Sequence, residues 1–297
     1  MTIKKISALL ILSVLPLGVL TAQEDAKTDY LPKAGDWAVG IDMQPVYSLF
    51  GNIANANAAN GLGQFGGEDP LLGGISIMGK LMLDKTTAFR VNLGVAKDLD
   101  HTYRYQLDDE PIKSQENPFS EAKVQDLNQH NRAVYSLSAG IEFRKGKERI
   151  QGYFGGDVVF GMRKDRYQFS YGNAITEVNQ TPTRTNYNAV GPGALVVNNV
   201  GYWQATYATE KYQNTLIAGI AGKVGVEYFV VPKLSFGGEV SLLISEQFVR
   251  GAYTKSEGYN PTTGLVEEHT ELVSPASRTF HIGTEDMGGK LFMMFYF

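Results

Sequence analysis

Apolar and polar residues alternate at every second position over eight segments of the chain. In the first segment, every odd residue from Trp37 to Met43 is apolar, and the residues between them are small or polar. Successive side chains of a strand point to opposite faces, so each segment predicts a β-strand with one apolar and one polar face. The predicted strands span residues 37–44, 75–83, 89–96, 132–144, 154–163, 215–228, 234–245 and 290–297.

The connections between these segments alternate between short turns and long polar loops. Short turns are expected at residues 84–87, 145–149 and 231–233, and long loops at residues 51–70, 104–127, 172–209 and 255–283. Such sorting, together with strands near the roughly 9–11 residues of a tilted membrane-crossing strand, is typical of a transmembrane barrel. We therefore predict an all-β fold, an eight-stranded antiparallel up-and-down transmembrane β-barrel over residues 35–297. The alternative is a soluble β-sandwich.

Aromatic residues gather where the apolar faces of the predicted strands meet the short turns. Amphipathic rings favour the interface between membrane and water, so these residues predict an aromatic girdle on the periplasmic side. The alternative is the aromatic core of a sandwich. The residues concerned are Trp37, Phe89, Phe143, Phe154, Tyr228 and Phe236, with the terminal Phe297 at the same level.

Charged residues recur on the opposite, polar face of the strands. A glycine often stands two positions before an acid, as in Gly140 and Glu142, and therefore on the same face. An eight-stranded barrel is only wide enough for side chains to fill, so we predict a plug of paired charges with a structural role. A gated ion path, a solute site or paired carboxylates for glycoside chemistry are the alternatives. The predicted network comprises Asp42, Lys80, Arg90, Glu142, Arg144, Asp157, Arg163, Lys223, Glu227, Glu239 and Lys290.

The first 22 residues are typical of a secretory signal peptide. Lys4 and Lys5 precede an apolar run from Ile6 to Leu20, and Ala22 offers a small residue for cleavage. An N-terminal membrane anchor is the alternative, although the run is shorter than the roughly 20 residues of a spanning helix. Residues 23–34 are then expected to form a short periplasmic segment ahead of the barrel.

Composition narrows the possible classes further. The chain has no cysteine, which excludes disulfides, thiolate metal sites and an anchor on an N-terminal cysteine. Without Lys4 and Lys5 it carries 25 basic against 31 acidic residues, a net charge of −6, and shows no basic face for nucleic acid. The 33 glycines and the 16 tyrosines and 15 phenylalanines fit a barrel with aromatic girdles.

Candidate catalytic and ligand-binding motifs are unspecific. Asp98, Asp100 and His101 could form an aspartate–histidine hydrolytic site, but their spacing is not specific and favours solvated loop residues. The acids at 267 and 268 with His269 could bind a metal in the same unspecific way. We therefore expect no catalytic residues, no metal and no cofactor. The apolar stretch from Val190 to Trp203 is expected to pack over the barrel mouth or to contact a partner.

The C-terminal strand ends in a terminal phenylalanine, with apolar or aromatic residues at every second position before it. Its outward residues are Leu291, Met293, Phe295 and Phe297. With the signal peptide and the eight alternating strands, this ending resembles the small outer-membrane β-barrel proteins, namely the OmpA-type transmembrane barrel and its Bacteroidota-type relatives. The resemblance implies that the C-terminal strand is an assembly signal read by the barrel-assembly machinery. Because residues 35–297 end with the barrel, a cell-wall tether is not expected.

From these features we expect a non-enzymatic protein of the Gram-negative outer membrane. Its barrel would present long extracellular loops for a structural or surface-binding role. The expected partners are outer-membrane lipid and lipopolysaccharide, the barrel-assembly machinery and an unknown extracellular ligand. The alternatives are a narrow porin-like conduit for small solutes or ions and, third, an outer-membrane hydrolase acting on lipid A or peptides.

Overall fold

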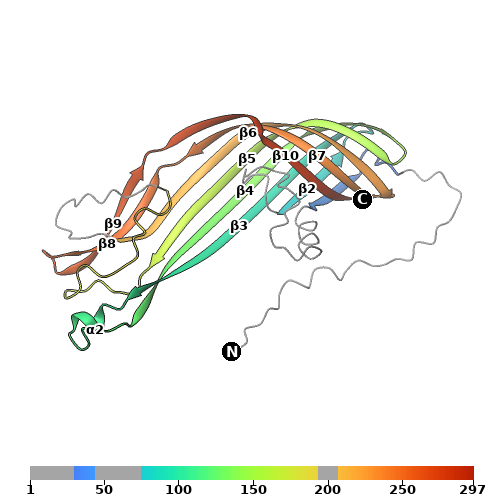
Figure 1. The fold of residues 1–297 in the computed structure, drawn as a ribbon. Coiled ribbons are helices and arrows are strands. Elements are labelled where there is room, and N and C mark those ends of the chain that lie inside the picture. Colours follow the sequence, from blue (N-terminus) through green and yellow to red (C-terminus); the bar gives the residue numbers. More distant parts are fainter. Residues whose placement is uncertain (1–29, 44–74, 193–206) are drawn as a thin grey trace, which may run out of the picture.

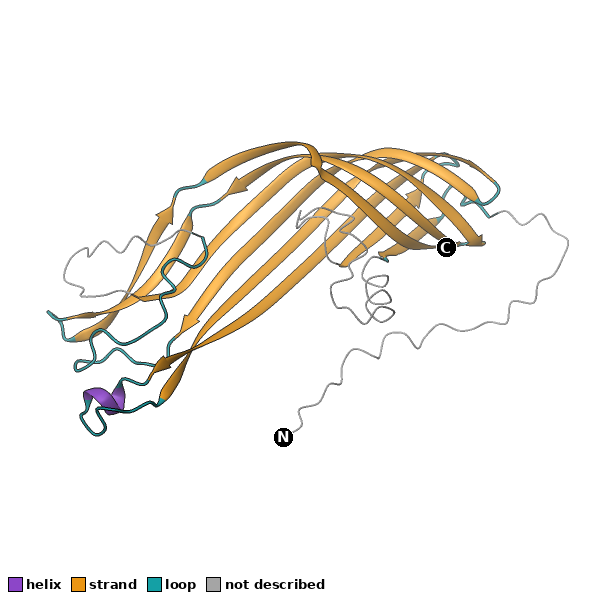
Figure 2. Cartoon of the chain, viewed as in Figure 1, coloured by secondary structure: helices purple, strands orange, loops and turns teal. Residues whose placement is uncertain are grey.

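The computed structural model describes residues 30–43, 75–192 and 207–297 of the chain. Its described part is built almost entirely from antiparallel strands (Figures 1 and 2). The strands are β1 (Trp37–Asp42), β2 (Ile75–Met82), β3 (Thr87–Leu107), β4 (Lys123–Lys147), β5 (Ile150–Ser170), β6 (Tyr207–Val231), β7 (Leu234–Val249), β8 (Ala252–Asn260), β9 (Leu265–Ser274) and β10 (Ser277–Tyr296). A four-residue helix, α2 (Glu110–Lys113), lies between β3 and β4.

Eight of these strands close into a ring, which confirms the predicted barrel. Their order is β1–β2–β3–β4–β5–β6–β7–β10, and β10 pairs with β1 to complete the circle, with Val39 opposite Phe295. The pairing of β5 with β6 joins the two halves of the wall, with Val158 opposite Ile220. A closed ring has no free edge strand, unlike an open sheet.

Strands β8 and β9 continue two strands of the ring instead of adding to it. Strand β8 follows β7 along the same edge of β6. Thr215 of β6 lies opposite Val249 of β7, and Tyr212, three residues earlier on β6, lies opposite Tyr253 of β8. Strand β9 pairs with β8 as β10 does with β7. The predicted loop at 255–283 is therefore wrong, because most of it forms a hairpin that prolongs β7 and β10.

The other predicted loops are shorter than expected for a related reason. Strands β3 and β4 run as far as Leu107 and Lys123, so the loop at 104–127 shrinks to residues 108–122. Of the predicted loop at 172–209, residues 172–192 form a loop and residues 207–209 belong to β6. Residues 193–206 lie outside the described part, as do residues 51–70 of the first predicted loop. The long strands form a distal extension, which comprises residues 97–107, 123–133, 164–170 and 207–214 together with β8 and β9.

The opposite end of the ring, here called the turn end, has three tight connections at the positions that the sequence predicts. Strand β4 is joined to β5 through residues 148 and 149, and β6 to β7 through residues 232 and 233. Glu148 and Lys233 take positive φ angles of 61° and 71°, as such short hairpins require. Within the described residues, no helix is long and apolar enough to cross a membrane.

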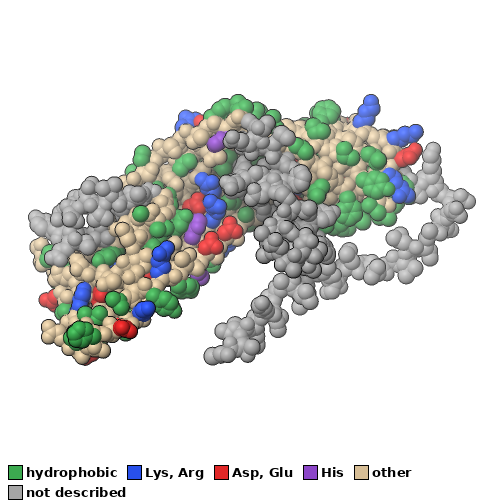
Figure 3. Space-filling view, in the orientation of Figure 1, with side chains coloured by type: hydrophobic (Ala, Val, Ile, Leu, Met, Phe, Trp, Pro, Cys, Tyr) green, Lys and Arg blue, Asp and Glu red, His purple; other side chains and the backbone are tan. Residues whose placement is uncertain are grey.

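The wall of the ring is apolar outside and polar inside. Outward residues of the ring are exposed although apolar; Leu93 is 53%, Phe160 56% and Val224 64% exposed. On the face shown in Figure 3, hydrophobic side chains lie on the wall near the turn end, whereas charged side chains lie at the edge of the turn end and over the distal extension. Inward neighbours such as Asp157 and Lys223 are buried.

Candidate functional site

The interior of the ring holds a network of charged side chains that almost no solvent reaches. Four cations and four anions form it, and each is 9% exposed or less. They come from β2 to β7 and face inward because they alternate with the apolar residues of the wall. We call them the charge network; its members are Lys80, Arg90, Glu142, Arg144, Asp157, Lys223, Glu227 and Glu239.

One half of the charge network centres on Glu142 and Glu227. The Lys80 ammonium lies 3.2 Å from a carboxylate oxygen of each. Arg144 lies 3.1 Å from the Oε1 of Glu142 and also pairs with Glu227. Lys80 and Arg144 therefore each pair with both carboxylates, so none of these four buried charges lacks an opposite charge.

The other half joins Arg90 to acids on the far wall. The Nη1 and Nη2 groups of Arg90 donate to the two oxygens of Glu239 at 2.6 and 3.2 Å, a bidentate pair. Lys223 lies 2.6 Å from Asp157 and 3.5 Å from Glu239. Arg90 Nη1 also lies 3.3 Å from Glu142, which links this half to the first. Removing an ion from water carries a penalty of several kcal/mol, so such a cluster is tolerable only when its charges are mutually paired.

Inward hydroxyl groups complete the network, and the sequence did not single them out as members. Tyr296 donates to Glu227 at 2.7 Å and accepts from Arg144 at 2.9 Å. Tyr153 donates to Glu239 at 2.9 Å, and Ser138 to Asp157 at 3.1 Å. Their inward parity on strands β4, β5 and β10 is the signal that could have identified them.

Apolar layers lie on both sides of the charge network. Towards the turn end, a core of nine buried residues closes the lumen, and Tyr30 and Leu31 pack against it. Towards the distal extension, a second core is formed by Val134, Val159, Ile217, Ala221 and Leu243. The first core comprises Ala38, Met78, Met82, Ala88, Tyr153, Phe229, Phe292, Met294 and Tyr296. Among the described residues, buried side chains therefore occupy the lumen from the turn end to the second core.

Three residues of the predicted network occupy its margins. Arg163 also faces the lumen but is one quarter exposed, and it pairs with Asp165 at 3.2 Å instead of with the eight residues of the charge network. It lies opposite Val134 of the second apolar core, at the distal end of the ring. Lys290 donates to Ser76. Asp42 is buried on β1.

A loop fills the open end of the distal extension. Residues 171–192, here called the distal cap, are held by the buried carboxylate of Asp126, which accepts hydrogen bonds from the N–H groups of Gly172 at 2.9 Å and Thr185 at 2.6 Å. The ring of Tyr187 stacks on that of Phe169, with centroids 4.8 Å apart. Together with Ala208 these rings form a third buried core.

Further charged contacts fix the distal cap to the neighbouring strands. Arg184 pairs with Glu257 of β8 at 2.6 Å, and its guanidinium lies 4.4 Å from the ring centre of Tyr171. The Lys211 ammonium donates to the carbonyl of Asn188, and burial lowers the pKa of Lys211 to about 8. The cap is thus a packed structure within the described residues.

Asp109, at the base of α2, ties the neighbouring loop to the distal cap. Its carboxylate accepts from the N–H of Thr183 at 2.6 Å and from the side-chain amide of Asn179 at 2.9 Å. Burial alone would raise the pKa of Asp109, but these hydrogen bonds hold that pKa below its ordinary value. The predicted packing of Val190 to Trp203 over the mouth can be followed only as far as residue 192, because residues 193–206 lie outside the described part. Val190 packs on the third core.

The structure separates the residues of the candidate hydrolytic site. Asp98 and Asp100 face the inside of the distal extension, opposite Arg132 and His130 of β4. His101 points outward, with its ring 6.5 Å from that of Tyr103. The three side chains therefore do not form one site. His130 instead stacks on Tyr167, with centroids 4.0 Å apart, and lies 3.3 Å from Asp165.

The candidate metal residues on β9 are separated in the same way. Glu267 and His269 lie on one face of the strand and Glu268 on the other. The Glu267 carboxylate is engaged by Asn260 at 3.0 Å and Thr263 at 2.7 Å. Within the described ranges, no group of three histidine, aspartate or glutamate side chains is arranged to hold a metal ion.

The aromatic residues predicted for the girdle lie on the outer wall. Phe143 and Phe154 are neighbours on β4 and β5, with ring centroids 5.5 Å apart, and Trp37 stacks on Phe297 at 4.4 Å. All the girdle residues face outward near the turn end, as does the row predicted to be the assembly signal, Leu291, Met293, Phe295 and Phe297.

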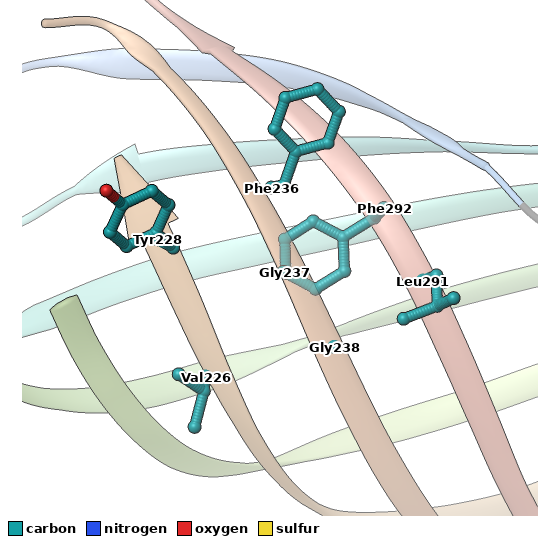
Figure 4. A pocket seen from close by; sticks show the side chains of 7 residues that line it. All are labelled: Val226, Tyr228, Phe236, Gly237, Gly238, Leu291 and Phe292. Carbon is teal, nitrogen blue, oxygen red and sulfur yellow. The ribbon is translucent and has the colours of Figure 1, made fainter. Parts of the chain in front are cut away.

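A shallow recess interrupts this outer wall across β6, β7 and β10 (Figure 4). It has a volume of about 280 Å³ and lies over Gly238, between Val226 and Leu291, with the rings of Tyr228 and Phe236 at its border. The neighbouring Gly237 faces inward, and the ring of Phe292 lies against it. The lining is almost entirely apolar, as on the rest of the wall.

No protein-family model matches the chain, and no curated protein is similar to it. Among solved structures, the chain is similar to the outer membrane protein OprG from Pseudomonas aeruginosa. The two share 9% sequence identity over 91% of this chain and 99% of that chain, with a TM-score of 0.34. At this level of similarity, the assignment of a closed barrel rests on the strand pairing alone.

Proposed function

We propose that this chain is a non-enzymatic outer-membrane barrel with a sealed lumen, which presents its distal extension and loops at the cell surface in a structural or binding role. The observation that carries the proposal is the charge network between two apolar cores, inside a wall that is apolar on the outside. Such a wall is reversed relative to a water-soluble protein, in which large apolar patches are normally buried.

The height of the apolar wall supports a position in a bilayer. On β5, outward residues are apolar or glycine from Phe154 to Met162, and the next outward residue is Lys164. Ten residues at about 3.3 Å each, tilted by about 40°, give a band about 25 Å tall, the height of the apolar band of outer-membrane barrels. On β7, the same interval separates Phe236 from Glu246.

The filled lumen argues against a conduit as the main function. An eight-stranded ring leaves room only for side chains, and here ion pairs and aromatic rings occupy that room. A moving ion would have to break several buried ion pairs at once. The packed distal cap and the β8–β9 hairpin instead offer a shaped surface at the outer end, where loops commonly carry recognition.

The partners that follow from this proposal are outer-membrane lipid, including lipopolysaccharide, and a ligand outside the cell. The barrel-assembly machinery would read the outward row of β10, which pairs with β1 to close the ring.

Planar-bilayer recording tests the sealed lumen. We expect purified protein, shown by flotation to be inserted in vesicles, to give no steady conductance, whereas a general porin in the same bilayer gives steps. Steady, reproducible steps from this protein would contradict the proposal and favour the narrow conduit.

Protease treatment of intact cells tests the orientation. Trypsin is expected to cut near the exposed Lys113 of α2 without permeabilisation, and to reach the turn end only afterwards. Cleavage in the reverse order would contradict surface presentation.

A further inference from the structure

Basic residues form a row on the outer wall where its apolar band ends. Lys97 of β3 lies opposite Ala133 of β4, which lies opposite Lys164 of β5. Lys164 in turn lies opposite Asn214 of β6, whose carbonyl accepts from the N–H of Arg250 at 2.8 Å. Cations thus alternate with small or neutral residues across the wall. We call Lys97, Lys164 and Arg250 the outer basic row.

These side chains face outward because their neighbours along each strand face inward. Val134 and Thr215, which adjoin Ala133 and Asn214, are buried in the lumen. The outward residues of the row below are Val95, Tyr135, Met162, Leu216 and Phe248, all apolar or aromatic. On β3 and β5 the row therefore lies at the upper edge of the apolar band, at the level of lipid headgroups if the band spans a bilayer. Directly after β7, Arg250 lies two outward positions beyond Glu246, where the band ends.

The charges of the outer basic row are not neutralised by the chain itself. Among the described residues, Lys97, Lys164 and Arg250 make no ion pair, and all three are exposed. Two other cations near this edge are committed to acids, since Arg166 pairs with Glu210 at 2.7 Å and Arg278 with Glu246 at 2.6 Å. The outward neighbours of Lys97 and Lys164 are neutral or basic.

The spacing fits a phosphate group between two cations. Neighbouring strands lie about 4.8 Å apart, so Lys97 and Lys164 are about 10 Å apart with only the methyl group of Ala133 between them. Flexible lysine side chains can converge on an anion over such a small residue, and a lysine is a point charge well suited to phosphate.

We infer that the outer basic row binds the phosphate groups of phosphorylated glycolipid headgroups in the outer leaflet. This inference rests on the proposed function, since it requires that the apolar band lies in a membrane. It adds to that function a defined lipid site on the wall formed by β3 to β7, which is separate from the distal cap.

The test compares binding of bis-phosphorylated lipid A and of its dephosphorylated form to the full-length barrel in neutral detergent micelles. The variant K97Q/K164Q/R250Q removes the row, and K85Q/K145Q/K147Q removes three exposed charges at the turn end as a matched control. A cation at a membrane surface contributes roughly fivefold to anionic-lipid binding, so we expect the first variant to bind lipid A on the order of 100-fold more weakly. The control is expected to stay within about threefold of the wild type.

Equal losses in both variants, or an unchanged affinity of the first, would overturn the inference. So would equal binding of dephosphorylated lipid by the wild type. Migration of unboiled and boiled samples in gels identifies the folded barrel in every variant. A wild-type chain that is soluble without detergent would overturn the proposed function itself. That result differs from a folded barrel whose lipid binding does not depend on phosphate, which overturns only this inference.

Discussion

At the scale of single residues, the interior of the barrel is specified by charge balance. Glu227 is fully buried and contacts Lys80, Arg144 and Tyr296, so its carboxylate serves several partners at once. A buried ion pair adds little net stability compared with an apolar pair, but loss of one partner leaves the remaining charge without compensation.

We therefore expect Glu227→Gln to lower the free energy of unfolding by about 3–5 kcal/mol, measured by urea titration in lipid vesicles. The exposed control Glu116→Gln should stay within about 0.5 kcal/mol of the wild type. The double variant E227Q/K80M, which restores neutrality, should be more stable than E227Q alone. A loss below about 1 kcal/mol for E227Q would show that the network is not tightly coupled.

Two glycines of the wall provide a second comparison at this scale. A Cβ on the inward Gly237 would meet the ring of Phe292 at 2.2 Å, whereas one on the outward Gly222 would meet nothing within 4 Å. We expect Gly237→Ala to destabilise the barrel by about 1–3 kcal/mol and Gly222→Ala to have little effect, by the same urea titration. Equal effects of the two substitutions would argue against the assigned faces.

The sequence revealed the charged residues of the interior but not all of their partners. Alternation alone places Glu142, Asp157 and Glu239 on the inner face. It does not show that Tyr153 reaches Glu239, because that contact crosses the lumen between strands distant in the sequence. Arg163 has the same parity, yet it pairs with Asp165 at the distal end of the ring and not with the charge network, since parity gives the face of a strand and not the height along it.

At the scale of elements, the strands that line the distal extension were the hardest to predict. On β3 the alternation continues past the predicted end of the strand, with Leu99, Tyr103 and Tyr105 facing outward, but Lys97 and His101 interrupt that apolar face. On β9 both faces are polar from Glu267 to Glu271, so the local pattern indicates no strand there. These segments are strands because they continue the ladders of the ring, a tertiary effect that the local pattern does not contain.

The distal cap depends on one carboxylate, that of Asp126. Asp126→Ala removes two hydrogen bonds between a charged acceptor and main-chain N–H groups, each contributing about 1.5–3 kcal/mol. Limited trypsin cleavage after Arg184 is expected to become at least tenfold faster, because the cap opens more often. Glu177→Ala, in the exposed part of the cap, should leave the rate unchanged. An unchanged rate in D126A would mean that other contacts hold the cap.

The buried Lys211 predicts a pH dependence of the same region. Its pKa is lowered to about 8 in the folded protein, below the ordinary 10.5, so the folded state disfavours the charged amine. The unfavourable contribution of Lys211 to the free energy of unfolding is fully present below pH 8. It is relieved as the pH rises from about 8 towards 10.5. Between pH 7 and pH 9.5, the wild type should gain about 2 kcal/mol relative to Lys211→Met in urea titrations. A constant difference between the two proteins over this range would contradict the assignment.

At the scale of the whole molecule, the fold was predictable because every strand of the ring follows one rule: outward residues are apolar, and inward residues fit the narrow lumen. Each of the eight predicted segments corresponds to one strand of the ring, and the three short turns fall where the sequence places them. The rule follows from closure, since a ring of this size has an inside too narrow for anything but side chains. The identity of a surface ligand is not governed by such a rule.

The central claim is that the outward face of the ring contacts lipid. The chain has no cysteine, so single cysteines can be placed on one face of β5 at Val158, Phe160 and Gln168 and labelled with a fluorophore. In proteoliposomes, labels at 158 and 160 are expected to be quenched by brominated lipid and protected from iodide, whereas the label at 168, in the distal extension, should show the reverse. Efficient quenching by iodide at 158 and 160 would place that face in water and contradict the account.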